Sequence, residues 1–383
     1  MYAMKRMNND MAVSPIVATL VLIVVAVIGA VAVGTIMGTF STQVSKQANA
    51  GQAASASQNE IIIAGSTTCI PVEQNLAADF QRQNPGVQIN VQGGGSSEGP
   101  QSVALGIADI GATSSFGTIT SAMTSTANAN NPIYQNLYYT QIGGRGVVFI
   151  QHNDNLSVTT NLVQTSDVLS AYSDAAQNAG VTSTTDGAIS SGTTMEQREA
   201  GSGTMATVYK WAGGILASNA SANTALTGCP VNNGNAAMLA AVSGTAHTFG
   251  FVDAGYAITG GVTSNTTAPG ITIVGVTQGG VHYIPTHSNI KNALKDWYYG
   301  NAQDTTPGTS TGAITTGNYP QGLTGGLYWI TTGTSPSSMS GNKVVEGTSS
   351  ASSVVQGLIQ FAKTPSEQSA FSNAGVYSMY DFI

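Results

Sequence analysis

Hydrophobic and polar residues are arranged in two different ways along this chain. From Ala12 to Phe40 no charged residue occurs, and as a helix this run would measure about 43 Å, longer than the hydrocarbon core of a bilayer at about 30 Å. From Glu60 onward, short apolar runs of strand length alternate with apolar residues spaced three or four apart, as on helices. The pattern predicts an α/β domain preceded by one long hydrophobic helix.

Polar turns follow each of the first three predicted strands. The strands are expected at 60–64, 87–91 and 108–113, and the turns rich in Ser, Thr and Gly lie at 65–68, 93–97 and 113–115. Helical patterns follow the first two turns, with Pro71 early in one helix and Pro100 expected as the first residue of the other. Ligands bind beyond the carboxyl ends of strands in open α/β sheets, and helix starts present free N–H groups to anions.

A fourth turn of this kind occurs in the motif Arg198-Glu-Ala-Gly-Ser-Gly-Thr204, which leads into an apolar-periodic run from Met205 to Trp211. Ser and Thr at a helix start, with flanking glycines, form a corner that accepts an anion. The guanidinium of Arg198 adds forked donors that match a tetrahedral oxyanion. Four such corners together predict an oxyanion site.

The amino-acid composition restricts the classes of function and of partner that fit this chain. Only 8% of the 383 residues are charged, the net charge is -7 and glycine occurs 46 times, which is typical of a neutral, hydroxyl-rich extracellular surface. No cluster of Lys and Arg occurs apart from Lys5-Arg6, which excludes nucleic acid as a partner.

The cysteines and the glycosylation sequons both fit an extracellular protein, but neither feature establishes that location. Cys69 and Cys229 are either joined by one long-range disulfide or are two buried thiols. Glycosylation sequons begin at Asn155, Asn219 and Asn265.

Residues for catalysis or metal binding do not form a recognisable pattern. The histidines, His152, His247, His282 and His287, have no metal-ligand spacing, and no Gly-x-Ser-x-Gly motif occurs. Asp253, in Gly-Phe-Val-Asp-Ala-Gly-Tyr, is interpreted as the cap of a turn. We therefore expect a binding protein without cofactor or metal and not an enzyme.

From Glu60 to the C-terminus the chain resembles the periplasmic phosphate-binding proteins of ABC importers. The similar segments are Ala64–Thr68 with Pro71, the Gly-Gly-Gly-Ser-Ser run from Gly93, Ala108–Ser114, and Arg198–Thr204. The resemblance implies a ligand site for phosphate or a related oxyanion, and an ABC permease as recipient. The residues it implies as ligands are Thr67, Thr68, Ser96, Ser114, Arg198, Ser202, Gly203 and Thr204.

Ser114 departs from the family pattern. Many members have an aspartate there, and a carboxylate that can only accept a hydrogen bond rejects sulfate, which has no proton to donate. Serine both donates and accepts, so a second oxyanion besides phosphate stays open. Asp109 and Glu98 are alternative sources of the acceptor, although Asp109 is better placed to cap a turn.

The same resemblance implies two lobes joined by two crossings. The first lobe is expected at 60–143 and 326–383, and the second lobe at 144–325, with crossings at 134–143 and 326–330. A Ser/Thr/Gly/Pro-rich insertion occupies 301–320, and a closing helix is expected over 352–371. Hinge closure would bring Arg198 and Ser202 of one lobe to Thr67 and Ser96 of the other.

The N-terminal segment resembles archaeal type IV pilin-like proteins. A short basic leader (1–11) precedes Ala-Val-Ser-Pro-Ile and the apolar helix (12–40), and cleavage is expected between Met11 and Ala12, where Met11 is an unusual residue. Small residues recur at Ala26, Ala30, Gly34 and Gly38, which suits close helix packing in a filament.

Residues 41–59 are interpreted as a tether. Two functions follow: a surface-anchored oxyanion-binding protein for ABC-type uptake, or a pilin-like filament subunit that displays the domain and self-assembles through its helix.

Overall fold

The computed structural model describes residues 60–154, 162–177, 181, 189–214, 216, 224–278, 281–302 and 319–383. The predicted leader, apolar helix and tether (1–59) lie outside the described residues, as do most of the 301–320 insertion and the sequons at Asn155 and Asn219. Among the helices that are described, none is long and apolar enough to cross a membrane.

A parallel three-stranded unit opens the domain. β1 (Glu60–Gly65) pairs in parallel with β2 (Gln88–Gly93) and with β3 (Ile110–Thr113). α2 (Ile70–Gln83) and α3 (Glu98–Ala104) form the two crossovers. The predicted strands and the first helix are confirmed. The expected start of α3 at Pro100 is wrong by two residues, because a proline is tolerated throughout a first turn whose N–H groups have no partner within the helix.

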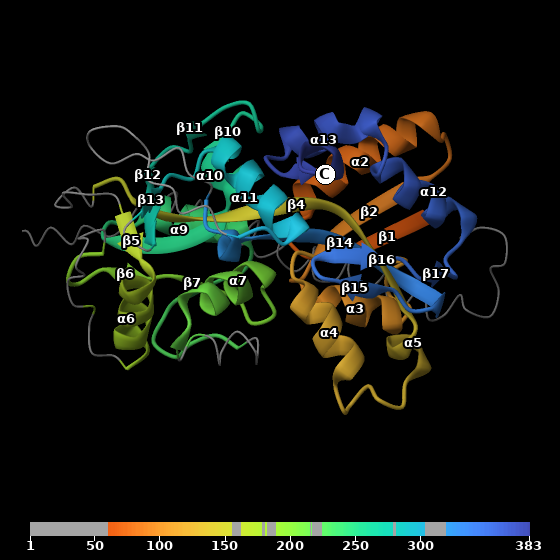
Figure 1. Ribbon diagram of the computed structural model, residues 1–383, viewed down its shortest axis with the longest axis horizontal. Coiled ribbons are helices and arrows are strands. Elements are labelled where there is room, and N and C mark those ends of the chain that lie inside the picture. The colour runs from red at the N-terminus through yellow and green to blue at the C-terminus, as the bar shows by residue number, and fades with distance from the viewer. Residues whose placement is uncertain are drawn as a thin grey trace, which may run out of the picture. The chain divides into compact units, whose positions relative to one another are not determined.

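Two long antiparallel strands carry the chain between the predicted lobes. β4 (Leu137–His152) and β14 (Thr324–Ser335) pair along most of their length, with Gly144 opposite Gly326. β14 continues the first unit through β3, whereas the last part of β4 pairs with β9 (Thr248–Asp253) and β12 (Ile271–Gln278). With β13 (Val281–Tyr283) at one edge, the sheet is therefore continuous in the order β13-β12-β4-β14-β3-β1-β2, and β4 is yellow in Figure 1.

The remaining elements either add short strands to this sheet or pack around it. In the predicted second lobe they are β5 (Leu162–Gln164), α6 (Thr165–Ala176), β6 (Thr194–Met195), β7 (Gln197–Arg198), α7 (Gly203–Ala212), β8 (Val231–Asn232), α9 (Asn235–Gly244), α10 (Ala254–Ala257), β10 (Ile258–Thr259), β11 (Thr266–Thr267), β13 (Val281–Tyr283), α11 (His287–Tyr299) and η1 (Gln321–Leu323). In the predicted first lobe they are α4 (Phe116–Thr124), α5 (Pro132–Gln135), β15 (Ser338–Ser340), β16 (Lys343–Val345), β17 (Thr348–Ser349), α12 (Ser353–Ala362), η2 (Pro365–Glu367), α13 (Gln368–Asn373), β18 (Tyr377–Ser378) and η3 (Met379–Asp381).

Buried apolar residues form separate clusters on either side of the crossing. One cluster includes Val147–Ile150 and extends to Leu323, with Tyr377 and Phe382 added from the C-terminal end. Another includes Ile61, Val72 and Leu358. We keep the names first lobe and second lobe for the predicted parts on these two sides.

Glycines in β4 let helix α11 pack directly against the strand backbone. A Cβ atom at Gly144 would lie 2.2 Å from Leu294 Cδ2, and one at Gly146 would lie 2.4 Å from Ile290 Cγ2. These distances are far below van der Waals contact, so larger residues would displace α11. The glycines at the crossing therefore serve close packing.

The prediction of a single closing helix over 352–371 is wrong. α12 ends at Ala362, a short 3₁₀ turn (η2) begins at Pro365, and α13 begins at Gln368. Pro365 has no N–H to donate and its ring disfavours helical geometry in the residue before it. Apolar residues keep a helical spacing on both sides of the break because α12 and α13 both pack on the same side of β1, near α2 (Figure 1).

The two cysteines are not bonded to each other. Cys69 and Cys229 are both free and buried, and they belong to different hydrophobic clusters, one on each side of the crossing. Of the two alternatives from the sequence, the structure has the pair of buried thiols.

Candidate functional site

The Arg198–Thr204 motif forms a tight turn at the start of α7. Ser202 is the N-cap residue, and its Oγ accepts a hydrogen bond from the Met205 N–H at 3.2 Å. Gly201 has a φ of +87°, a left-handed conformation that favours glycine. Gly203 then begins the helix. The turn therefore presents the positive end of the helix dipole toward the first lobe.

Arg198 links the two lobes. Its side chain is 1% exposed, and its Nη2 donates to Thr67 Oγ1 of the first lobe at 2.8 Å. Nη1 donates to Asn235 Oδ1 at 2.7 Å, and Nε forms an ion pair with Glu199 at 2.9 Å. The guanidinium is thus held in one orientation by partners on three elements.

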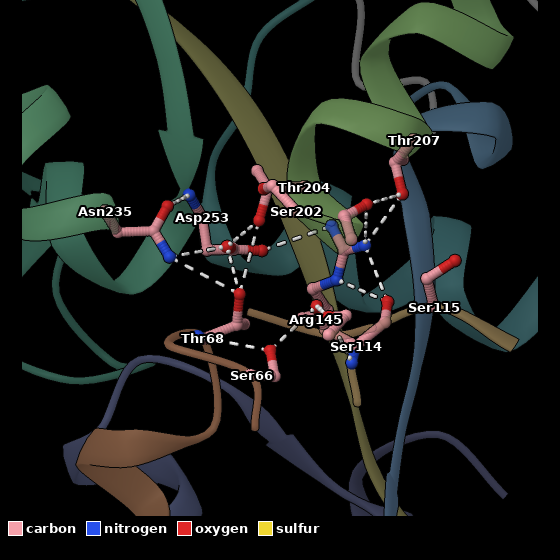
Figure 2. A network of polar contacts seen from close by, with 12 residues as sticks. Ser66, Thr68, Ser114, Ser115, Arg145, Ser202, Thr204, Thr207, Asn235 and Asp253 are labelled. Carbon is pink, nitrogen blue, oxygen red and sulfur yellow. Dashed lines mark hydrogen bonds and ion pairs between the residues drawn. The ribbon is translucent and has the colours of Figure 1, made fainter. Parts of the chain in front are cut away.

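A second link between the lobes is centred on Asp253, at the end of β9 (Figure 2). Its Oδ2 accepts hydrogen bonds from Thr68 Oγ1 at 2.6 Å and Thr204 Oγ1 at 2.7 Å. The Asn235 side-chain amide donates to the same oxygen at 2.9 Å. Three donors from both lobes therefore point at one negatively charged oxygen.

The other carboxylate oxygen of Asp253 faces Arg145 of β4. Arg145 Nη1 lies 3.1 Å from Asp253 Oδ1, and both side chains are 1% exposed. Within the described part of the chain neither of these two atoms has an aligned hydrogen-bond partner, so the contact is an ion pair. Arg145 Nη2 donates to the Ser114 carbonyl and to Thr207 Oγ1, both at 2.7 Å, and Nε donates to the same carbonyl at 3.2 Å.

Three serine hydroxyls from the first lobe complete the site. Ser66 donates to Ser114 Oγ at 3.0 Å, and the Ser96 and Ser114 hydroxyls lie 3.1 Å apart. A Cβ atom at Gly203 would lie 2.5 Å from Ser96 Oγ and 2.7 Å from Ser114 Oγ. Only glycine therefore lets the start of α7 approach these hydroxyls.

The structure brings the sequence-predicted residues together at one place. Thr67 meets Arg198, Thr68 meets Thr204, and Ser96 meets Ser114 opposite Gly203. Ser202 differs in that its side chain caps α7.

The alternative acceptors named from the sequence lie elsewhere. Asp109 Oδ2 accepts from the Ile62 N–H at 2.8 Å, and Glu98 is exposed and folds over Gly94.

Sequence reasoning missed Arg145, Asn235 and Asp253. The interpretation of Asp253 as a turn cap is wrong in one respect: it precedes α10, but its side chain makes no cap hydrogen bond there and points into the network instead. A usable signal existed for Arg145, which is the single charged residue in the apolar stretch from Leu137 to Gln151. Asn235 had none, since it follows a glycine-rich turn like many others.

Comparisons with known proteins were made at three levels. No family model matches the chain, and no curated protein matches it. Solved structures do match. A phosphate ABC transporter substrate-binding protein of Clostridium perfringens, solved with bound phosphate, is 16% identical, with 84% of this chain and 100% of that chain covered and a TM-score of 0.54.

Two further structures give the same result. A high affinity periplasmic phosphate-binding protein bound with phosphate is 14% identical over 83% of this chain and 90% of that chain, with a TM-score of 0.52. An ABC-type phosphate transport receptor of Vibrio cholerae is 17% identical, with 83% of this chain and 99% of that chain covered and a TM-score of 0.50. At these identities the similarity is one of fold, and the described part of this chain has the mixed α/β fold of periplasmic binding proteins.

Proposed function

We propose that residues 60–383 bind a tetrahedral oxyanion, with inorganic phosphate as the preferred ligand, between the two lobes. The observation that carries the proposal is the convergence of Thr68, Thr204 and Asn235 on one carboxylate oxygen of Asp253. Donors from both lobes are thus already directed at a negative oxygen in a buried place. An oxyanion has the same need, and Arg198 lies beside these donors with its guanidinium held in position.

Asp253 also supplies the acceptor that Ser114 lacks. The carboxylate lies on the second lobe, in contact with Thr68 and Thr204 of the predicted ligand set. Phosphate near neutral pH still carries a proton to donate to such a carboxylate, whereas sulfate does not. Asp253 Oδ1 accepts no hydrogen bond from the described residues, and a buried acceptor left without a donor costs about 1–3 kcal/mol. We therefore expect phosphate to be preferred over sulfate by one order of magnitude or more.

The role that we propose for this binding is capture of the ion for ABC-type uptake at the cell surface. The proposal rests on the fold shared with the phosphate receptors and on the resemblance of 1–40 to pilin-like anchors. Residues 12–40 would hold the domain to the membrane, and the tether would give it reach.

Calorimetric titration of the full chain in detergent micelles tests the proposal. Phosphate, arsenate, sulfate, molybdate and tungstate are titrated separately at pH 7. We expect saturable heat with phosphate and arsenate, and at least tenfold weaker binding of sulfate. No heat with any of these ions would contradict the proposed function. Equal affinity for phosphate and sulfate would contradict the role given to Asp253.

A further inference from the structure

A cavity of about 1070 Å³ lies beside the Arg145–Asp253 pair. Its walls come from α4 and the start of β14 on one side and from α7 and η1 on the other. Ligand sites for organic molecules measure about 300–1,000 Å³, so this volume far exceeds what a single tetrahedral ion needs. Arg198 is not among its lining residues, whereas Arg145 and Thr207 are.

The charge of the cavity is opposite to that of the chain. The sequence carries 18 acidic and 11 basic residues, yet the described residues that line the cavity include no carboxylate. Of the two cations in the lining, Arg145 is paired with Asp253, so the free positive charge comes from Lys210. Lys210 is exposed on α7 and forms no ion pair with any described residue. Such a lining favours an anionic ligand.

The start of α4 faces this cavity. Ser115 is the N-cap residue and makes no side-chain cap hydrogen bond, and Ser115, Phe116 and Gly117 all line the cavity. The first N–H groups of a helix have no partner within the helix and attract anions. Independently, the hydroxyl of Tyr328, in the cavity wall next to Gly326, is buried and has no hydrogen-bond partner among the described residues.

Aromatic side chains also form part of the cavity wall. Trp211 and Trp297 are half-buried in its wall, together with the ring of Phe116. A Cβ atom at Gly322 would lie 2.9 Å from Trp211 Cδ1, so glycine lets η1 pack closely against this edge of the indole. Residues with hydroxyl and amide groups, among them Thr324 and Asn342, line the same cavity. Aromatic faces beside hydroxyls and amides are suited to the apolar face and the hydroxyl groups of a sugar ring.

We propose that this cavity binds a sugar phosphate. The phosphoryl group is held by the N-terminus of α4 and Lys210, and the sugar ring packs on Trp211 and Trp297 with its hydroxyls on the polar wall. The site differs from the proposed oxyanion site because, of the predicted oxyanion ligands, only Ser114 lines it, whereas Arg198 and Thr68 do not. The inference therefore does not rest on phosphate binding at Arg198.

Titration of the full chain with glucose 6-phosphate, followed by heat and by tryptophan fluorescence, tests the proposal. Trp329 is fully buried and bonded to Glu73, so a ligand-dependent change reports on Trp211 and Trp297. We expect saturable binding of glucose 6-phosphate, no comparable fluorescence change with glucose, and roughly tenfold weaker binding in Lys210→Ala because a charge-assisted hydrogen bond is lost. Lys291→Ala, which removes an exposed lysine outside the cavity, is the matched control and should bind like the parent.

Arg198→Ala separates the two sites. We expect it to weaken binding of inorganic phosphate at least a hundredfold and to leave binding of glucose 6-phosphate within about twofold, since Arg198 does not line the cavity. The proposal is overturned if glucose 6-phosphate does not bind, if Lys210→Ala and Lys291→Ala weaken it equally, or if Arg198→Ala abolishes its binding while Lys210→Ala does not.

Discussion

Arg145 and Asp253 form a buried ion pair, with Nη1 of the arginine 3.1 Å from Oδ1 of the aspartate. The strands that carry them are paired, since Asp253 lies opposite Val147 in the β4–β9 ladder. Hydrogen bonds extend from the pair to Ser114 and Thr68 of the first lobe and to Thr204 of the second. The pair thus connects the strand that crosses between the lobes with the residues that we propose to bind the ligand.

Asp253→Asn should destabilise the protein strongly. The substitution leaves the buried Arg145 without its negative partner and places amide hydrogens opposite the donors of Thr68 or Thr204. Breaking a buried pair by removing one partner costs about 3–5 kcal/mol. Urea unfolding followed by circular dichroism measures the loss.

Asp79→Asn is the control for that measurement, because its pairing with Arg82 is at the surface, with 74% of the arginine side chain exposed. Exposed pairs contribute about 0–1 kcal/mol. Equal losses for the two variants would contradict the structural role of the Arg145–Asp253 pair.

Replacement of Arg198 separates its charge from its geometry. Arg198→Ala removes the hydrogen bonds to Thr67 and Asn235, and we expect phosphate affinity to fall at least a hundredfold, since charged hydrogen bonds contribute about 1.5–3 kcal/mol each. Arg198→Lys keeps the positive charge but lacks the paired N–H donors of the guanidinium, so we expect an intermediate loss of phosphate affinity. Calorimetry measures both, with the exposed Arg82→Ala as the control, which should bind normally.

Gly203→Ala tests whether α7 must touch the serines of the first lobe. Its φ is not positive, and alanine favours helices, so α7 itself should tolerate the change. The new Cβ would lie 2.5 Å from Ser96 Oγ and 2.7 Å from Ser114 Oγ and would push the lobes apart. We expect phosphate affinity to fall at least tenfold, as measured by calorimetry.

Gly244→Ala at the end of α9 is the matched control for Gly203→Ala. A Cβ atom there would meet no other atom within 4 Å, so binding should not change. If Gly203→Ala binds phosphate like the parent, the contact between α7 and the serines is not part of the site.

Local pattern was enough to predict the parts of the site that sequence motifs encode. β1, β2 and the turns that follow them could be read from apolar runs ending in Gly and Ser, and α7 from its Ser-Gly-Thr start. Each of these signals depends on residues adjacent in sequence. The partners of Arg198 at Thr67 and Asn235 are separated from it by 131 and 37 positions, but Thr67 could be expected once the turns were assigned to one sheet edge.

Features that depend on long-range packing were not predictable. The role of Asp253 depends on the register of β9 against β4 and on Arg145, which lies 108 positions earlier (253 − 145). The break between α12 and α13 has a local cause, Pro365. The helical spacing of apolar residues across 352–371 predicted one continuous helix in spite of this proline. The cavity beside α4 has no sequence signature because its walls come from both halves of the chain.

The buried thiols should be unreactive in the folded protein. Burial raises the pKa of Cys69 well above its usual value and that of Cys229 to about 11, so neither forms the reactive thiolate at pH 8. We expect negligible labelling by a thiol reagent in the native state and two labelled thiols after denaturation without reductant. Fewer than two in the denatured protein would indicate a disulfide.

Glu73 should make the protein less stable as the pH rises. Glu73 on α2 is 1% exposed, and its Oε1 accepts from Trp329 Nε1 at 2.8 Å, while its other oxygen has no hydrogen-bond partner among the residues that the structure describes. Burial raises the pKa of Glu73 to about 8, so the folded protein retains a proton that the unfolded chain releases above its ordinary pKa of 4.5. The stabilisation by this proton is complete below pH 4.5 and is lost as the pH rises toward 8.

Glu73→Gln should remove that pH dependence, because glutamine resembles the protonated acid in shape and still accepts from Trp329. At pH 7 the variant should be more stable than the parent by about 3 kcal/mol, from roughly 2.5 pH units at 1.4 kcal/mol each. At pH 4.5 the two should be nearly equal. Urea unfolding at both pH values measures the difference, and a parent protein at least as stable at pH 7 as Glu73→Gln would show that Glu73 is ionised in the folded state.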